Sequence, residues 1–253
     1  MTRAAVVTRD EPREGPLSAR LRDFGLEVLS WPVVRILPAQ DPAPLEAALQ
    51  ELSGFNWIVF TSRHAVEPVA GRLSARPERL RIAAVGASTA AALRDRGWVP
   101  DVVPEQASAE SLLGTLTPYI HPGTRVLFPA SSRALPVLPA GLRQLGAQVL
   151  EVEAYRTAAA PLDIEACRRS IEHGAVGAVT FTSPSCVEEL EHALGRGFFT
   201  RLLSTAVAVA LGETTGRALA QRGFEAVMAR PPTLEGLAAT TREALSANLN
   251  ARS

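Results

Sequence analysis

The stretch LRDFGLEVL at residues 21–29 recurs as LRQLGAQVL at residues 142–150, with identical residues at five of the nine positions. The two copies are 121 residues apart, from 21 to 142, and WIVFTS at 57–62 lies over AVTFTS at 178–183 with the same separation. A repeat this long is not the short period of a solenoid. It indicates two copies of one structural unit.

A third pair extends the repeat toward the C-terminus. VGASTAAALRDRG at 85–97 matches LGETTGRALAQRG at 211–223, now with a separation of 126 residues. An insertion of about five residues near 195–197 accounts for the change in separation.

Each copy alternates strand-like and helix-like segments, which predicts parallel sheets with helices on both faces. In the first copy, proline at the start and glycine after the end mark a helix from Pro16 to Gly25. Asp41-Pro42 is expected to cap a helix with Leu45, Leu49 and Leu52 on one face. The remaining expectations are strands at 4–8, 58–61 and 82–85, helices at 65–73 and 88–96, the latter closed by Gly97, and a last helix capped by Ser108.

Two extended, proline-bounded segments, SWPVVRILP at 30–38 and VEAYRTAAAP at 152–161, occupy equivalent places in the repeat. We interpret them as linkers paired with each other as strands. If both segments cross between the two domains at one place, the first βα unit of the chain belongs to the same domain as the last half of the chain. The expected organisation is one domain of residues 1–33 plus 161–253, a second of residues 39–152, and linker strands at 34–38 and 153–160.

Composition excludes several kinds of chemistry. All 26 basic residues among the 253 are arginine, and they balance 26 acidic residues. Without lysine there is no Schiff base, no pyridoxal phosphate attachment and no P-loop lysine. A net charge of zero argues against nucleic acid as a partner.

The longest apolar runs, such as residues 206–211, are far shorter than the ~20 residues of a membrane helix. The apolar stretch at 4–7 is too short for a signal peptide, so we expect a cytoplasmic protein without a membrane partner. Cys167 and Cys186 are expected to be buried small hydrophobic residues. The four histidines show no metal-ligand spacing, so no metal is expected.

The carboxyl ends of the predicted strands carry hydroxyl, glycine and arginine residues, and ligands gather at these ends in doubly wound sheets. Individually, such serines and threonines are typical helix N-caps. Together with the arginines they favour anion binding at helix starts. The candidate substrate-binding residues are Thr8, Arg9, Thr61, Ser62, Arg63, Gly86, Ser88, Thr89, Arg133, Arg156, Thr182, Ser183, Ser185, Gly212, Thr214 and Thr215.

The chain has two tyrosines, Tyr119 and Tyr155. Tyr119 follows a proline in a predicted loop and is expected to pack against its neighbours. Tyr155 lies in the linker segment, where it is either a packing aromatic or a proton donor. The sequence contains neither a dinucleotide fingerprint nor a Walker loop nor a nucleophile elbow.

The motifs, taken in order, strongly resemble the uroporphyrinogen-III synthase family over nearly the whole chain. They are VTR at 7–9, FTS at 60–62, AVG at 84–86 with Thr89, VEAYRT at 152–157, FTSPS at 181–185, GETT at 212–215 and PTLEGL at 232–237. Each motif alone is weakly specific, and their order and spacing carry the resemblance.

The resemblance implies two flavodoxin-like α/β domains joined by a two-stranded linker, with the N-terminal βα unit swapped into the C-terminal domain. It also implies a reaction without cofactor or metal. Linear hydroxymethylbilane loses water, its last pyrrole ring is inverted through a spiro intermediate, and the macrocycle closes to uroporphyrinogen III. The substrate carries eight carboxylates, which fits an anion-binding cleft.

By position, Tyr155 matches the family tyrosine thought to assist departure of the hydroxyl group. Thr89, Ser62, Ser183, Thr214 and Thr215 match residues that line the family's cleft. Arg63-His64 departs from the commoner family pattern, in which asparagine often follows, so no catalytic role is assigned to His64.

Two alternatives remain at this point. One is a bilobed sensor module that binds a tetrapyrrole or another anion without converting it. The other is a sugar-nucleotide transferase, which would need acidic metal-binding residues at strand ends, and none stand out. We expect a monomer in transient contact with the preceding enzyme of the pathway.

Overall fold

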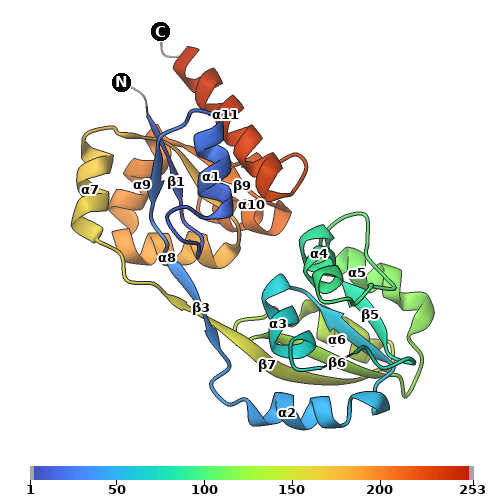
Figure 1. Ribbon diagram of the computed structural model, residues 1–253. Helices are drawn as coiled ribbons and strands as arrows, with labels where there is room; N and C mark the ends of the chain where they lie inside the picture. The colour runs from blue at the N-terminus through green and yellow to red at the C-terminus, as the bar shows by residue number, and fades with distance from the viewer. Residues whose placement is uncertain (1–2, 74, 251–253) are drawn as a thin grey trace. The chain divides into compact units, whose positions relative to one another are not determined.

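The computed structural model of the protein describes residues 3–73 and 75–250. The chain divides into two compact units (Figure 1). Unit 1 consists of Met1–Arg35 with Ala158–Ser253, and unit 2 is Ile36–Thr157. Both ends of the chain therefore belong to unit 1.

Unit 1 contains a five-stranded sheet in the order β10-β9-β8-β1-β2. Its strands are β1 (Ala4–Val7), β2 (Val28–Ser30), β8 (Val176–Phe181), β9 (Val207–Ala210) and β10 (Val227–Met228). All of their pairings are parallel. Read along the chain, this is the 2-1-3-4-5 order of flavodoxin-like sheets.

Helices cover both faces of this sheet because its strands are apolar on both sides. Val6 faces a core with Phe181 and Phe199, whereas its neighbours Ala5 and Val7 face a second core with Leu17 and Leu237. The first core lies under α7 (Ile164–Glu172), α8 (Pro184–Leu194), α9 (Arg196–Thr205) and α10 (Glu213–Ala220). The second lies under α1 (Pro16–Asp23) and α11 (Leu234–Asn250).

Unit 2 contains a second five-stranded sheet in the order β3-β7-β6-β4-β5. Its strands are β3 (Val34–Pro38), β4 (Trp57–Phe60), β5 (Arg81–Ala84), β6 (Arg125–Ser131) and β7 (Gln148–Ala159). The pairings of β4 with β5, of β4 with β6 and of β6 with β7 are parallel. A parallel bridge from Ala83 to Val102 adds one further position beyond β5.

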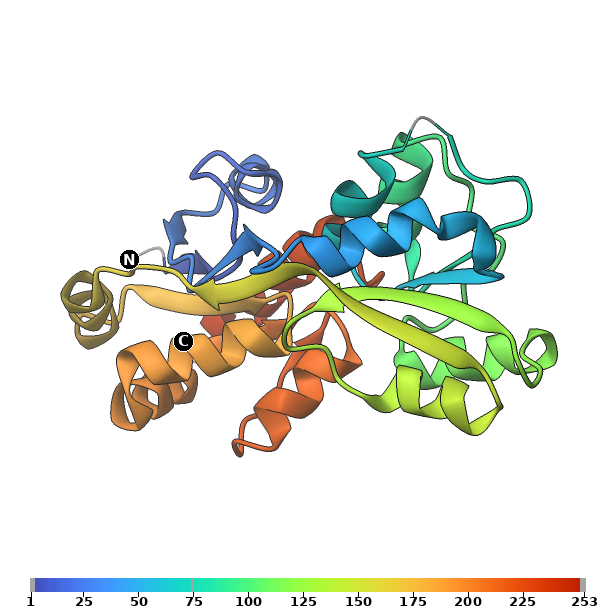
Figure 2. The same ribbon diagram turned by 90° about the horizontal axis from the view of Figure 1, so that it is seen from below.

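Successive residues of β4 again point into two different cores. Ile58 and Phe60 pack under α2 (Ala43–Gln50), α3 (Val66–Ala70) and α4 (Ala87–Asp95). Trp57 and Val59 pack under α5 (Ala109–Leu116) and α6 (Val137–Gln144). Figure 2 shows α2 and α6 on opposite faces of the β6–β7 part of this sheet.

The two units exchange halves of the sequence repeat. Strands β1 and β2 come from the first copy, yet they lie in one sheet with β8, β9 and β10 of the second copy. Conversely, β6 and β7 of the second copy lie in one sheet with β4 and β5 of the first. The predicted class, α/β with two flavodoxin-like parallel-sheet domains, is confirmed.

Three details differ from the sequence predictions. The helix expected at 65–73 is a 3-10 turn, η2 (Arg63–Ala65), followed by the short α3. Leu52 lies in a separate 3-10 turn, η1 (Leu52–Gly54), beyond the end of α2. The linker strand expected at 153–160 is not a separate strand but the second half of β7, which runs unbroken from Gln148 to Ala159.

The insertion expected near 195–197 falls between two helices. Gly195, with φ of +79°, ends α8, and α9 begins at Arg196. Glu191 of α8 holds α9 through Arg196 and also accepts from Arg222. Hydrogen bonds from Arg196 and Arg222, together with their positive charges, lower the pKa of Glu191 despite the opposing effect of burial. Within the described ranges, no helix combines the length and apolarity that crossing a membrane requires.

Candidate active site

Tyr155 is placed by an irregularity in the pairing of β6 with β7. Ala130 pairs with Glu153, but the next residue, Ser131, pairs with Tyr155, so β7 carries one extra residue at this point. Such bulges re-aim side chains and are common beside active sites. Here the bulge sets Tyr155 beside the last residue of β6, at the carboxyl edge of the unit 2 sheet.

The hydroxyl group of Tyr155 is hydrogen-bonded to the side chains of Ser62 and Ser131. Ser62 follows the end of β4, and Ser131 ends β6. The residue is 9% exposed, and burial raises the pKa of its phenol above the ordinary 10.0, although the two serine hydrogen bonds act in the opposite direction. The hydroxyl group therefore stays protonated at neutral pH and can donate a proton or a hydrogen bond.

The imidazole ring of His64 packs against the Tyr155 ring, with 5.7 Å between the ring centroids. The two rings are tilted by 51°. Ser62 caps the intervening turn by accepting a hydrogen bond from the backbone N–H of His64 at 3.2 Å. The N-cap interpretation thus holds for Ser62, which also binds the tyrosine.

A cavity of about 910 Å³ lies in unit 2 beside these residues. We call it the Tyr155 cavity. Its wall comes from β3, α2, α3, α4 and β7. Tyr155, His64 and Arg63 line it where they lie near the carboxyl ends of the strands, and Ile36, Leu37 and Leu45 contribute apolar surface. Three carboxylates, Glu46, Glu67 and Asp95, also line the cavity, so its wall is mixed. A cavity of this size with convergent polar groups is a candidate site for a small molecule.

Three arginines line the Tyr155 cavity, and two of them are neutralised within the protein. Arg72 pairs with Glu46 at 3.1 Å, and Arg96 pairs with Glu67. Arg63 is exposed and has no ion pair with any residue that the structure describes. It is therefore the cation of this wall that remains available for a ligand carboxylate.

Other residues that the sequence analysis assigned to the site also lie near these strand ends in unit 2, but they do not line the Tyr155 cavity. Arg156 lies outside the cavity wall, where it donates to Gln40 at 3.2 Å and pairs with Glu153 at 3.7 Å. Arg133 is exposed, and its backbone N–H donates to Ser131 at 3.1 Å. Thr61 is half-buried between β4 and Ser62, whereas Ser88 is exposed on α4.

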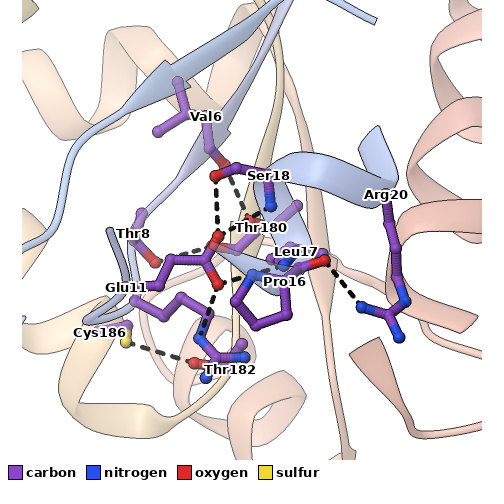
Figure 3. A network of polar contacts seen from close by, with 11 residues as sticks. Val6, Thr8, Glu11, Pro16, Leu17, Ser18, Arg20, Thr180, Thr182 and Cys186 are labelled. Atoms are coloured by element: carbon purple, nitrogen blue, oxygen red, sulfur yellow. Dashed lines mark hydrogen bonds and ion pairs between the residues drawn. The ribbon is translucent and has the colours of Figure 1, made fainter. Parts of the chain in front are cut away.

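In unit 1, the end of β1 is fastened to β8 by two threonines (Figure 3). The Thr8 hydroxyl donates to the carbonyl of Thr180 at 2.7 Å, and the Thr180 hydroxyl donates to the carbonyl of Val6 at 2.9 Å. Thr8 is fully buried. This hydroxyl therefore joins the two strands.

The sequence analysis missed Glu11, which lies at the centre of Figure 3. Its carboxylate accepts from the backbone N–H groups of Leu17 and Ser18 at 3.2 and 2.8 Å, and from the Ser18 hydroxyl at 2.8 Å. The Nε atom of Arg9 lies 3.4 Å from the same carboxylate, and the Glu11 side chain is 2% exposed. The sequence signal that could have revealed Glu11 is an acidic residue shortly before the proline that starts α1.

Glu11 thus occupies the position at the start of α1 that a bound anion takes in many α/β proteins. The guanidinium group of Arg9 is 12% exposed and is already paired with this carboxylate. The structure places Arg9 where the sequence predicts it, at the carboxyl end of β1, but part of its charge is used inside the unit.

The residues after β8 surround a buried cysteine. The Ser183 hydroxyl lies 3.3 Å from the sulfur of Cys186, and the Thr182 hydroxyl lies 3.8 Å from it. Ser183 therefore makes no side-chain cap to α8. Thr182, Ser183 and Ser185 are half-buried, so each keeps some surface at this strand end. Cys167 and Cys186 are both buried, as predicted.

The equivalent glycines Gly86 and Gly212 precede α4 and α10, and they differ in their surroundings. A Cβ at Gly86 would lie 2.7 Å from the Cβ of Ala107, whereas a Cβ at Gly212 would meet nothing within 4 Å. Both have extended backbone, with φ of −174° and −155°. Glycine is required for packing at 86, while at 212 it leaves the backbone open to a ligand.

The hydroxyl residues that follow these glycines lie in the first turns of the two helices. Thr89 and Thr215 are buried, and Thr214 is half-buried. Unit 2 therefore brings together Tyr155, Ser62 and Arg63, and unit 1 gathers Thr182 and Ser183 around Cys186. Among the described residues, no group of three His, Cys, Asp or Glu side chains is arranged to hold a metal ion.

Comparison with known proteins identifies one family, by a family match and by similar sequences. The family described as Uroporphyrinogen-III synthase HemD matches residues 15–239. A putative uroporphyrinogen-III synthase of Methanothermobacter thermautotrophicus is 32% identical over 245 residues, which is 92% of this chain and 95% of that protein. The uroporphyrinogen-III synthase of Synechococcus elongatus is 28% identical over 242 residues, 92% of this chain and 91% of that protein.

Solved structures show the same fold. A mutant uroporphyrinogen III synthase of the extremely thermophilic bacterium Thermus thermophilus superposes with a TM-score of 0.71 at 21% identity, over 96% of this chain and 99% of that one. The enzyme of Helicobacter pylori gives a TM-score of 0.58 at 19% identity, over 99% of this chain and all of that one.

Proposed function

The chain belongs to the uroporphyrinogen-III synthase family, and on that premise we propose that it converts hydroxymethylbilane to uroporphyrinogen III, with Tyr155 as its proton donor. In this reaction the linear tetrapyrrole loses water, its last ring is inverted and the macrocycle closes. The observation that carries the proposal is the buried Tyr155 hydroxyl, held by Ser62 and Ser131 at the wall of the Tyr155 cavity.

The departing group is a hydroxyl, which leaves as water once it receives a proton. Burial keeps the pKa of Tyr155 above its ordinary value, so the phenol holds the proton that the leaving group needs. Ser62 and Ser131 can stabilise the phenolate left behind, because a hydroxyl can donate as well as accept. General acid catalysis of this kind contributes about 10²–10⁴-fold in rate.

The enzyme must also hold a conformation that the free substrate seldom adopts, because the unaided reaction closes the ring without inversion. Orientation alone can supply ~7–11 kcal/mol. We propose that Arg63 binds one substrate carboxylate, since it has no ion pair within the described residues. The backbone N–H groups at Gly212, with Thr214 and Thr215, are proposed to bind another.

The other proposed contacts with the substrate likewise come from hydroxyl groups and an arginine. Arg9, Thr182, Ser183 and Ser185 are proposed to contact the substrate from unit 1, with Arg9 sharing its charge between Glu11 and a carboxylate. We further propose that the enzyme works in the cytoplasm and receives its substrate in a transient contact with the preceding enzyme. Direct transfer is favoured because the free substrate cyclises unaided.

The test is to supply freshly generated hydroxymethylbilane and to score the product isomers by chromatography. We expect isomer III as the main product, formed faster than isomer I appears in a protein-free control. Exclusive formation of isomer I at the control rate would instead support a binding module that holds the tetrapyrrole without converting it.

A further inference from the structure

A second pocket, of about 450 Å³, lies at the opposite edge of the unit 2 sheet from Tyr155. Trp57 and Arg81, the first residues of β4 and β5, line it, as does Thr124, which directly precedes β6. We call it the Arg81 pocket. It is about half the volume of the Tyr155 cavity and shares no lining residue with it.

Two unpaired guanidinium groups line this pocket. Arg79 lies in the turn that precedes β5, and Arg81 is the first residue of that strand. Both side chains line the pocket, while Leu80 between them is buried. Neither arginine has an ion pair with a described residue. By contrast, the nearby Arg76 pairs with Asp101 at 2.7 Å and donates to two backbone carbonyls.

Arg81 is held in place by aromatic rings rather than by a carboxylate. Its guanidinium carbon lies 5.6 Å from the Trp57 ring centroid and 5.8 Å from that of Tyr119. These two rings are themselves in contact, at 5.8 Å between centroids. Stacking of this kind orients the planar group and leaves its N–H edges available to a ligand.

The other polar groups of the pocket can also donate hydrogen bonds. Asn56 accepts from the backbone N–H of Arg125 through Oδ1, which leaves its amide N–H groups without a partner among the described residues. Thr124 contributes a hydroxyl and His121 a ring nitrogen. No Asp or Glu within the described ranges lines the pocket. Positive charge and hydrogen-bond donors without a neutralising carboxylate are the features of an oxyanion site.

We propose that the Arg81 pocket binds a small molecule through its phosphate or carboxylate group. The planar guanidinium fork can hold two oxygens of one such group. The proposal is independent of the function of Tyr155, because the two sites lie at opposite edges of the sheet. A long polyanion such as nucleic acid is disfavoured because the chain as a whole has no net positive charge.

Isothermal titration calorimetry with pyrophosphate, inorganic phosphate and citrate at low ionic strength tests the proposal. We expect saturable binding with a Kd on the order of 1 mM or lower for at least one of them. Tighter binding of pyrophosphate than of citrate assigns a phosphate ligand, and the reverse order assigns a carboxylate. Lack of saturation by about 10 mM for all three would overturn the proposal.

Variants locate the anion on the protein. Arg81→Gln and Arg79→Gln should each weaken binding about tenfold or more, which corresponds to the loss of one charge-assisted contact. The Arg79 side chain has no ion pair with a described residue, so Arg79→Gln should fold even if Arg81→Gln does not. Arg201→Gln removes the same charge from the exposed face of α9 and should leave the Kd unchanged.

Arg63→Gln distinguishes the Arg81 pocket from the Tyr155 cavity and should also leave the Kd unchanged. Weakening by Arg63→Gln or Arg201→Gln equal to that by Arg79→Gln would overturn the assignment. So would a polyglutamate peptide that binds more tightly than all three small anions, because that result indicates a docking surface for an acidic protein.

Discussion

The Tyr155 hydroxyl is buried, yet it has polar partners on both sides. The cost of burying a phenol is small when its hydrogen bonds are kept, whereas burying a phenolate is far more costly. Ser62 and Ser131 supply those hydrogen bonds from the ends of two neighbouring strands. This environment favours the neutral acid, which is the form that can protonate a leaving hydroxyl.

The raised pKa of Tyr155 predicts the alkaline limb of the pH–rate profile. Most of the phenol keeps its proton at pH values below 10.0, and the proton is lost as the pH rises through the raised value. We therefore expect the alkaline limb of kcat/KM that arises from Tyr155, with rates corrected for the protein-free reaction, to be centred above pH 10. An alkaline limb centred well below that pH, present in the wild type and absent in Tyr155→Phe, would contradict the assignment.

Glu11 has a structural role at the start of α1, and Glu11→Gln should reveal it. The amide keeps the size of the side chain but replaces an accepting oxygen by a donor facing backbone N–H groups. We expect a loss of about 1–3 kcal/mol in the free energy of unfolding, measured by urea denaturation.

The matched control is Glu14→Gln, whose side chain is 76% exposed and pairs with Arg22 at 2.8 Å. An exposed pair contributes about 0–1 kcal/mol, so this variant should unfold close to the wild type. Equal effects of the two substitutions would show that the buried contacts of Glu11 add nothing to stability.

At the scale of elements, strands and repeat-related helices could be predicted from sequence. Apolar runs such as 57–60 and 176–181 mark strands buried on both faces, and Gly97 ends its helix with a φ of +74°. The candidate residues at strand ends, Ser62 and Ser183 among them, follow from the same pattern, whereas the sequence places Tyr155 in a linker segment and its role comes from the family resemblance. Local chemistry determines these features, so a single sequence reveals them.

Features that depend on partners distant in the sequence could not be predicted. The bulge that brings Tyr155 to Ser131 depends on the register between two strands, and the hydrogen bond between Tyr155 and Ser62 depends on contacts between distant parts of the chain. By contrast, the causes that break the helix expected at 65–73 into a 3-10 turn and α3 are local: Ser62 caps the first turn, and Gly71 follows the last. Periodicity does not report either cause.

The open space at Gly212 predicts a functional effect without a structural one. We expect Gly212→Ala to raise KM about tenfold, because a methyl group there obstructs the approach of a carboxylate to the start of α10. Its free energy of unfolding should stay within about 1 kcal/mol of the wild type, since extended backbone accepts alanine.

Two other glycines serve as controls for Gly212→Ala. Gly197→Ala in α9 also meets nothing within 4 Å and should leave KM unchanged. Gly86→Ala should destabilise by about 1–3 kcal/mol, because its Cβ would approach Ala107 too closely. An unchanged KM in Gly212→Ala would show that no substrate group approaches there.

At the scale of the whole molecule, the exchange of repeat halves makes the first segment indispensable to the last. Strand β1 lies between β8 and β2, so deleting residues 1–35 removes an inner strand from unit 1. Unit 2 contains both of its cores within 36–157.

We therefore expect a chain of residues 36–157 to unfold cooperatively on heating, as measured by circular dichroism. The deletion of 1–35 should leave only that one transition, with the transition of unit 1 lost. Retention of both transitions in the truncated chain would contradict the exchange of halves.

We propose that Tyr155 directs the conversion of hydroxymethylbilane to uroporphyrinogen III. The most direct measurement is the rate and isomer ratio with freshly generated substrate for wild type, Tyr155→Phe and Ser204→Ala, which deletes a hydroxyl of α9. We predict that Tyr155→Phe lowers kcat about 10²-fold or more and shifts the product toward isomer I, while its unfolding and its KM change little. Ser204→Ala should match the wild type. A Tyr155→Phe enzyme with full rate and an unchanged excess of isomer III would contradict the claim.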